Sequence, residues 1–294
     1  MKKKLLITGA SGFLGYHLLR LAAKDWEVFG ICNSHGFDFA DAVSVKCDIT
    51  NYIELGNFFD DIEPDAVIHT AAIADAGFCQ NNKEVSYAVN VDATKNLAGI
   101  CCDFQIPFAF TSTDLVFDGA KGMYMEEDAK NPLSVYGQHK SMAEDEAVKI
   151  YPGATVFRLP LMFGDEHAGS SNYFSKFLKQ LRLGERVNLF SDEYRSVCGA
   201  KSISGGILKL FETTSGIIHL AGRERLSRYE FGLKVAKAFN FSEGLIDSCS
   251  QKDFKTDTPR PADVSLNINK AISLGFSPLA VAEELQLIMS QKYC

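Results

Sequence analysis

The chain has 294 residues and a mass of 32.4 kDa, and 46% of its residues are hydrophobic and 23% charged. This composition is typical of a folded globular protein and argues against long disordered segments. The formal net charge of -7, with acids spread along the sequence, argues against a basic patch for nucleic acid or an anionic membrane surface. No apolar run approaches the roughly 18 residues of a membrane span, so we expect a soluble, cytoplasmic protein.

The cysteines give no sign of a disulfide framework or a zinc site. The sequence has eight of them, and none forms a C-x-x-C pair. His17, His139 and His167 also lack the spacing of metal ligands. We therefore expect reduced thiols and no metal site.

Apolar strand-like runs alternate with helical patterns over the first 160 residues. The expected strands are Lys4 to Thr8, Trp26 to Cys32, Val43 to Cys47, Ala66 to Thr70, Pro107 to Ser112 and Ala154 to Leu159, and the expected helices include Tyr52 to Phe59, Glu84 to Asp103 and Ser134 to Ile150. Such alternation, with several strands apolar throughout, indicates a parallel sheet covered on both faces. The predicted fold class is therefore α/β, a doubly wound parallel sheet of the Rossmann type.

The pattern loosens after about residue 160. Helices are expected over Tyr173 to Leu183, Lys201 to Glu212, Ser227 to Phe239 and Leu279 to Gln291, with strands near Val187 to Phe190 and Gly216 to Leu220. We predict a dinucleotide-binding domain over residues 1–160. Residues 161–294 are then a smaller C-terminal α/β lobe for the substrate, interleaved with the main sheet.

Gly9, Gly12 and Gly15 lie directly after the first strand and open a helix. Glycines at this spacing let backbone N–H groups approach a pyrophosphate, and the last one allows close packing of helix on strand. A tight strand-to-helix turn without a ligand is the alternative. The loop predicts a dinucleotide site formed by Gly9, Ser11, Gly12, Phe13, Leu14 and Gly15.

The ends of the second and third strands bear on the choice of cofactor. The second strand leads into Ile31-Cys32-Asn33-Ser34-His35, without the acid that commonly holds the adenosine ribose of NAD. A neutral Asn33 leaves room for a 2'-phosphate, so the sequence slightly favours NADP(H) over NAD(H). Asp48 and Ile49 close the third strand, where a carboxylate can reach the adenine amino group or cap the following helix.

Tyr136 and Lys140 are four residues apart in an expected helix, and their side chains should share one face. A lysine beside a phenol stabilises the phenolate and is predicted to lower the pKa of the tyrosine. Tyr136 is then a candidate proton donor and acceptor. The same spacing also arises by chance in surface pairs.

With the glycine loop, Thr111 to Asp114 at a strand end and Tyr136-x-x-x-Lys140 on the next helix, the chain resembles the extended short-chain dehydrogenase/reductase family. His69 to Ala72, Asn90 to Asn96 and Arg158 to Gly164 are similar to further segments of that family. The resemblance implies an NAD(P)-dependent oxidoreductase with the catalytic residues Thr113, Tyr136 and Lys140. It also implies that the cofactor is bound by Ala71, Ala72, Thr111, Leu159 and the pair Tyr136 and Lys140.

Within the family, Ser112 to Phe117, Asn131 to Gly137 and Thr258 to Pro261 look most like the dTDP-4-dehydrorhamnose reductases. The regulatory beta subunits of methionine adenosyltransferase are a second close likeness. Two positions depart from the reductase pattern: Leu115 replaces a tyrosine, and Leu161-Met162 replaces Ser-Trp. The resemblance thus implies reduction of a nucleotide-linked keto sugar, and a non-catalytic regulatory subunit and a nucleotide-sugar epimerase are the alternatives.

The substrate-binding residues predicted from the motifs are Ser112, Thr113 and Asp114. Arg195 and Arg260 in the C-terminal half are suited to the phosphates of a nucleotide-sugar. Surface arginines paired with nearby acids would look the same in sequence. The expected partner is a small nucleotide-sugar, and the sequence leaves open whether the protein forms a homodimer.

Overall fold

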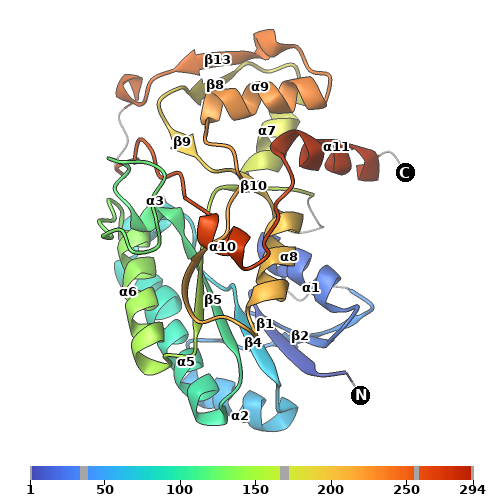
Figure 1. Ribbon diagram of the computed structural model, residues 1–294, viewed down its shortest axis with the longest axis vertical. Coiled ribbons are helices and arrows are strands. Elements are labelled where there is room, and N and C mark those ends of the chain that lie inside the picture. The colour runs from blue at the N-terminus through green and yellow to red at the C-terminus, as the bar shows by residue number, and fades with distance from the viewer. Residues whose placement is uncertain (1, 34–38, 166–171, 255–257, 293–294) are drawn as a thin grey trace.

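Figure 1 shows the computed structural model, which describes residues 2–33, 39–165, 172–254 and 258–292. The larger part of the molecule is a parallel sheet with helices on both faces. The smaller part lies at one end of this sheet and is formed by segments from the second half of the chain. The candidate site lies where the strands of the larger part end.

The main sheet contains seven of the described strands, all paired in parallel, in the order β11-β6-β5-β4-β1-β2-β3. Their bounds are β1 Lys4–Thr8, β2 Glu27–Cys32, β3 Ala42–Lys46, β4 Ala66–His69, β5 Phe108–Thr113, β6 Thr155–Leu159 and β11 Gly216–His219. The predicted doubly wound α/β fold is confirmed. Strand order reverses at β1 and β4, and ligands of such sheets bind outside the carboxyl ends of the strands at that point.

Alternate residues of the strands pack against different helices, as a sheet buried on both faces requires. Leu5 and Ile7 belong to a buried cluster with α1 Phe13–Ala22 and α8 Ala200–Leu210. Leu6, between them, packs with α2 Tyr52–Ile62, α5 Ala93–Phe104 and α6 Val135–Ile150. The carboxyl ends of the strands are thereby held between two rigid layers.

The long helix expected over Glu84 to Asp103 is interrupted. It consists of α4 Lys83–Tyr87, a π-helical turn at Ala88–Asp92 and α5. Asn90, in the π turn, is fully buried, and its amide accepts a hydrogen bond from the Ile73 N–H at 2.9 Å and donates to the Ile73 carbonyl at 3.1 Å. These bonds hold the segment after β4 against the interrupted helix. The π turn itself is a local change of helical geometry that side-chain periodicity does not reveal.

The smaller lobe has its own apolar core around Phe163, Phe174 and Phe231. Its main elements are α7 Tyr173–Arg182, β8 Val187–Phe190, α9 Arg228–Ala238, β13 Ile246–Cys249 and α11 Val281–Lys292. Further short elements of the described residues are α3 Ala76–Asn81, β7 Met162–Phe163, β9 Tyr194–Arg195, β10 Cys198–Gly199, β12 Leu226–Ser227 and α10 Asn269–Ser273, with 3-10 turns at Asp114–Val116, Glu243–Leu245 and Gln251–Asp253. Since β11 pairs with β6, the second half of the chain also contributes to the main sheet.

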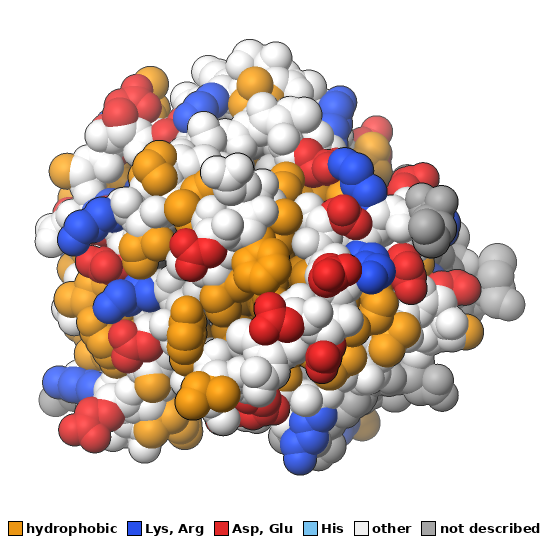
Figure 2. Space-filling view, turned by 90° about the horizontal axis from the view of Figure 1, so that it is seen from below, with side chains coloured by type: hydrophobic (Ala, Val, Ile, Leu, Met, Phe, Trp, Pro, Cys, Tyr) orange, Lys and Arg blue, Asp and Glu red, His pale blue; other side chains and the backbone are white. Residues whose placement is uncertain are grey.

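On the face drawn in Figure 2, the Lys and Arg side chains are scattered among acidic and apolar ones and do not gather into a patch. Within the described residues, no helix combines the length and the apolar composition needed to cross a membrane.

Candidate active site

The glycine loop connects β1 to α1 at the carboxyl edge of the sheet. Gly9 has a φ of 66°, and a Cβ added there would lie 2.7 Å from the backbone of Ala71. A Cβ added at Gly15 would clash with the Gly9 carbonyl oxygen. The N-cap of α1 is Gly12, which provides no side-chain cap, and the first turn contains no acidic residue. The helix therefore presents free N–H donors and its positive end, as a phosphate site requires.

Asn33 and Asp48 both lie exposed at strand ends, beyond β2 and β3. Asp48 does not cap the following helix, because the N-cap of α2 is Asn51. Its Oδ1 instead accepts hydrogen bonds from the N–H and hydroxyl of Thr50, at 2.9 and 2.7 Å. The Ile49 side chain is buried in the core. Ser34 and His35 lie outside the described residues.

The other predicted cofactor residues follow the central strands: Ala71, Ala72, Thr111 and Leu159. The Ala71 N–H donates to the Thr8 hydroxyl at 3.2 Å, which ties the ends of β4 and β1 together. Leu159 pairs in register with Thr113 across β6 and β5. The structure thus brings the glycine loop, the strand-end alanines and the Thr111 to Thr113 segment to one edge of the sheet.

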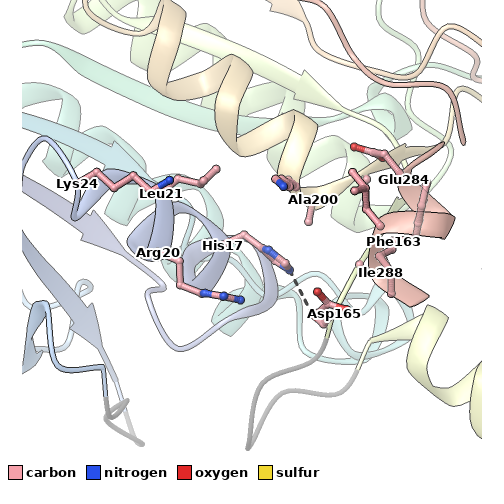
Figure 3. Close-up of a pocket in the computed structure, with 13 residues that line it drawn as sticks. His17, Arg20, Leu21, Lys24, Phe163, Asp165, Ala200, Glu284 and Ile288 are labelled. Carbon is pink, nitrogen blue, oxygen red and sulfur yellow. Dashed lines mark hydrogen bonds between the residues drawn. The ribbon is translucent and has the colours of Figure 1, made fainter. Parts of the chain in front are cut away.

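Two of the cavities formed by the described residues lie near the functional candidates and share no lining residue. The first, of about 220 Å³, lies between α1, α8 and α11 (Figure 3). The second, of about 430 Å³, is lined by Leu115, Ser134, Arg195 and Arg260 and by α3 with the residue before it, Asp75. Leu115 and Ser134 are sequence neighbours of the predicted catalytic residues. The second cavity is therefore the candidate substrate site.

Thr113 is the last residue of β5, and Tyr136 lies in the first turn of α6. The Ser134 hydroxyl caps this helix by accepting a hydrogen bond from the Gly137 N–H at 3.1 Å. The Thr113 hydroxyl donates to Asp114 Oδ1 at 3.2 Å and accepts from the Leu115 N–H at 3.2 Å. The buried Ser112 hydroxyl has no hydrogen-bond partner among the described residues, so it stands ready for a polar group of a ligand.

The expectation that Lys140 lowers the pKa of Tyr136 is wrong for this structure. Burial raises the pKa of Tyr136, and the negative charge of Asp114 raises it further, while the nearby Thr113 hydroxyl acts in the opposite direction. Lys140 is not among the causes of the shift. The phenol consequently stays protonated at neutral pH and can act as a proton donor.

Lys140 is itself buried, with its Nζ 4.0 Å from the centroid of the Phe110 ring. Burial lowers its pKa to about 7, against the opposing effect of Glu144. The neighbouring His69 is enclosed between the hydroxyls of Thr8, at 2.6 Å, and Thr94, at 3.1 Å. Burial, with Lys140 as a second cause, lowers the pKa of His69 to about 3, so this ring is neutral at physiological pH.

The lowered pKa of Lys140 predicts a pH-dependent gain in stability for Lys140→Met. Because its folded-state pKa of about 7 lies below the ordinary 10.5, the unfolded chain binds more protons between these values. The penalty for burying the amine is complete below pH 7 and disappears as the pH approaches 10.5. Urea denaturation at pH 6, 8 and 10 should show the largest stabilisation by Lys140→Met at pH 6. Lys149→Met, at an exposed position of the same helix, is the control, and a gain independent of pH would contradict the assignment.

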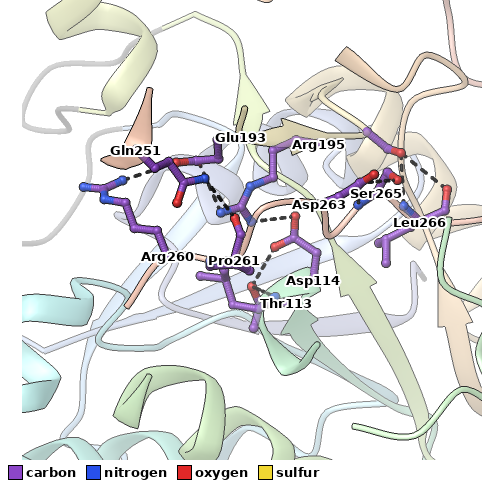
Figure 4. A network of polar contacts seen from close by, with 12 residues as sticks. Thr113, Asp114, Glu193, Arg195, Gln251, Arg260, Pro261, Asp263, Ser265 and Leu266 are labelled. Carbon is purple, nitrogen blue, oxygen red and sulfur yellow. Dashed lines mark hydrogen bonds and ion pairs between the residues drawn. The ribbon is translucent and has the colours of Figure 1, made fainter. Parts of the chain in front are cut away.

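Asp114 and Arg195 form part of a buried chain of charges next to Thr113 (Figure 4). Arg195 Nη1 lies 3.0 Å from Asp114 Oδ2, and its Nη2 lies 3.4 Å from Glu193 Oε1. Arg260 lies 3.5 Å from the second oxygen of Glu193. Burial raises the pKa of Asp114, and Arg195 opposes this shift. Arg195 is therefore a buried partner of two carboxylates, and Arg260, with a side chain 49% exposed, is the more accessible arginine.

The family of the chain follows from a match over nearly its full length. The model of the RmlD substrate binding domain family matches residues 3–294. The chain belongs to the RmlD substrate binding domain family. The predicted likeness to dTDP-4-dehydrorhamnose reductases is thereby confirmed.

Two relatives represent the functional range of this similarity. A probable low-salt glycan biosynthesis reductase of Haloferax volcanii is 31% identical over 285 residues and covers 95% of each chain. The methionine adenosyltransferase 2 subunit beta of Danio rerio is 26% identical, covering 94% of this chain and 86% of the relative. The predicted likeness to the methionine adenosyltransferase beta subunits therefore extends over most of the chain.

Solved structures share the fold. A hypothetical dTDP-4-dehydrorhamnose reductase from Sulfolobus tokodaii has a TM-score of 0.83 and 32% identity, covering 96% of this chain and 98% of that one. A dTDP-4-dehydrorhamnose reductase from Bacillus anthracis, in complex with NADP, has a TM-score of 0.88 at 22% identity and covers 99% and 100% of the two chains. At 22% identity, the Bacillus anthracis structure is evidence for the fold of this chain and not for its function.

Sequence reasoning missed two parts of the candidate site. Helix α3 contributes to the wall of the candidate substrate cavity. The sequence signal for this helix is Asp75, whose carboxylate caps it by accepting a hydrogen bond from the Phe78 N–H at 2.7 Å. Glu193 is the second part. It lies only two residues before Arg195, but its burial between two arginines depends on contacts that are distant in sequence.

Proposed function

We propose that this chain is an NAD(P)-dependent reductase of a nucleotide-linked keto sugar, similar to dTDP-4-dehydrorhamnose reductase. The observation that carries the proposal is the meeting of Thr113 and a protonated Tyr136 at the carboxyl edge of a doubly wound sheet, next to a cavity of about 430 Å³. The reductase names of the Haloferax and Sulfolobus relatives support it.

The residues of the glycine loop fit a dinucleotide. Gly9, Gly12 and Gly15 leave the backbone accessible, and the uncapped N-terminus of α1 suits the pyrophosphate. Asn33, at the end of β2, has no charge to oppose a 2'-phosphate, which supports NADP(H) over NAD(H). In this proposal Ser11, Phe13, Leu14, Asp48, Ile49, Ala71, Ala72, Thr111 and Leu159 complete the cofactor site.

A Gly15→Ala variant is expected to lose most of its affinity for NADPH. The added methyl group must displace the Gly9 carbonyl, which disrupts the loop and costs about 1–3 kcal/mol of stability. Gly205→Ala, in α8 with open space around its Cβ position, should leave NADPH binding unchanged. Calorimetric titration with NADPH and thermal denaturation of both variants check this, and an unchanged affinity in Gly15→Ala would refute the assignment of the loop.

When bound, the reduced nicotinamide supplies the hydride. The chain's own residues do the remaining work. Tyr136 donates its phenolic proton to the substrate carbonyl oxygen, and the Ser112 hydroxyl and the Thr113 hydroxyl, once it turns from Asp114 Oδ1 to the substrate, donate hydrogen bonds to the same oxygen. Lys140 positions the cofactor ribose. Burial raises the pKa of Tyr136 and the negative charge of Asp114 raises it further, so the phenol stays protonated.

The substrate is proposed to enter between α3 and the loop that contains Arg260. Arg260, rather than Arg195, is the first phosphate contact, because Asp114 and Glu193 already neutralise the buried Arg195. Leu115 contributes an apolar surface to this cavity. Residues 1–160 bind the dinucleotide and also form part of the substrate cavity, through α3, Leu115 and Ser134, and residues 161–294 complete the cavity with Arg195 and the segment around Arg260.

The test is oxidation of NADPH and of NADH in the presence of a panel of nucleotide-linked 4-keto sugars. A lasting fall in absorbance at 340 nm with at least one sugar is the expected result. An epimerase would return its hydride and show no lasting change. Tight NADP binding without oxidation across the panel, together with a co-purifying enzyme, would replace the proposal with a regulatory subunit.

A further inference from the structure

A groove lies on the surface of the molecule between α2 and the C-terminal end of α5. Its volume is about 260 Å³, and it shares no lining residue with the candidate substrate cavity. Tyr52 and Ile53 of α2 line it and are 55% and 73% exposed, and Phe104 of α5 lines it and is 45% exposed. The Phe104 ring also packs on the buried Phe59, at a centroid distance of 6.0 Å. The chain therefore holds large apolar side chains in place at the surface.

Gly56, in the middle of α2, lines the same groove. A Cβ added there would have no neighbouring atom within 4 Å, so no contact inside the chain requires a glycine at this position. Glycine is unfavourable in a helix interior, because it loses the most backbone entropy on folding. What it provides at this place is a low point on the surface of α2. Another molecule can approach the backbone of the helix closely there.

Acidic side chains border the apolar part of the groove. Asp60 and Asp103 line it, and Asp61 follows Asp60 in the last turn of α2. Among the described residues, none of these three carboxylates has an ion-pair partner. Acids in the last turn of a helix also oppose its dipole, which favours cations there. Figure 2 faces the end of the molecule at which α2 lies in Figure 1, and acidic and apolar side chains adjoin on this face.

Lys95 of α5 and Lys4 of β1 bring positive charge to these helices, but both are already engaged. Lys95 lies 3.8 Å from Asp92, and Lys4 Nζ donates to the Ile62 carbonyl, at the end of α2, at 2.8 Å. Neither lysine lines the groove, and α2 itself contains no Lys or Arg. A cation brought by another molecule would therefore compensate both the acids of the groove and the unfavourable end of α2.

We propose that the groove between α2 and α5 docks another protein, through a segment of that partner in which an apolar side chain is flanked by Lys or Arg. The apolar side chain packs on Ile53 and Phe104 over Gly56, and the cations pair with Asp60 and Asp103. A second copy of this chain does not fit, because a symmetric contact through this face sets the acids of one groove against those of the other. An anionic membrane or a nucleic acid is repelled by the same acids. The proposal is independent of the proposed function.

Selection of random peptides displayed on phage, each of about 12 residues or roughly three helical turns, against the full chain tests the proposal. Peptides that also bind the Ile53→Ser/Phe104→Ser variant are removed, which leaves those that require the groove. The remaining peptides are expected to combine apolar side chains with a net positive charge. Calorimetry with one such synthetic peptide should show at least about tenfold weaker binding to Asp60→Asn/Asp103→Asn, because charge-assisted contacts are lost. Glu243→Gln, which removes an exposed acid of the smaller lobe, should bind it as the wild type does.

Gly56→Gln separates docking from folding. Glutamine is a better helix former than glycine and its Cβ meets no neighbouring atom, so thermal denaturation should give a Tm at or above that of the wild type. Its side chain fills the groove, and peptide binding should fall at least about tenfold. Leu183→Ser removes an apolar side chain that is 63% exposed in the smaller lobe, and it should leave peptide binding unchanged.

Three outcomes would overturn the proposal. The first is that the selected peptides are neutral or acidic, or that none depends on Ile53 and Phe104. The second is a dimer in sedimentation that the Ile53→Ser/Phe104→Ser variant abolishes, because a second copy then covers the groove. The third is binding to anionic phosphatidylserine vesicles that the same variant abolishes, since the groove then faces a membrane.

Discussion

Replacement of Tyr136 by Phe is expected to reduce the rate of keto-sugar reduction about 10²- to 10⁴-fold, the usual contribution of a positioned general acid. The substitution removes only the phenolic hydroxyl. Since burial and Asp114 raise the pKa of Tyr136, the wild-type hydroxyl is protonated over the neutral range, and its proton is the one that the reduced carbonyl oxygen requires. Steady-state NADPH oxidation with an accepted sugar measures the loss.

Two controls separate this chemistry from a structural effect. NADPH affinity and thermal stability of Tyr136→Phe should remain close to those of the wild type. Tyr151→Phe, at the C-terminal end of the same helix, removes an equivalent hydroxyl away from the site and should retain full activity. An unchanged rate in Tyr136→Phe would exclude the tyrosine as the acid and would leave the enzyme proposal without its central residue.

Local sequence was sufficient to predict the elements of this site that depend on backbone geometry. The glycine loop is an example, because a strand, three glycines and a helix define a turn whose conformation requires little from the rest of the chain. Thr113 at a strand end and Tyr136 in a first helical turn were likewise correctly placed. The parallel, doubly wound sheet was predicted from the alternation of strands and helices in the first 160 residues, whereas the order of its strands was not.

Electrostatics could not be predicted in the same way. The predicted effect of Lys140 on Tyr136 rests on helical spacing alone, whereas the pKa of Tyr136 is determined by burial and by Asp114, on another element. Arg195 lies 81 residues from Asp114 in the chain, and its partnership with that carboxylate required the smaller lobe to fold against the strand ends. Charges in a buried site depend on such distant contacts, which no local pattern encodes.

Arg158 provides the largest expected effect on stability. It is 2% exposed, and its Nε and Nη2 donate to the two oxygens of the buried Glu144 at 3.0 and 2.9 Å. Arg158→Met would leave Glu144 largely uncompensated, because Lys130, 3.3 Å away, is shared with Asp145. Removing one partner of a buried pair typically destabilises by about 3–5 kcal/mol. Urea denaturation of the variant should show a loss of this size.

The double variant Arg158→Met/Glu144→Met distinguishes the loss of an ion pair from the loss of packing. With both charges removed and their volume filled by apolar side chains, neither the guanidinium nor the carboxylate is left buried without the other, so most of the stability should return. Arg186→Met, which breaks an exposed pair with Asp247, should have little effect. If the double variant were as unstable as Arg158→Met alone, the stabilisation would have to come from the other contacts of Arg158, such as its hydrogen bond to the Glu126 carbonyl at 3.2 Å, and the pair itself would contribute little.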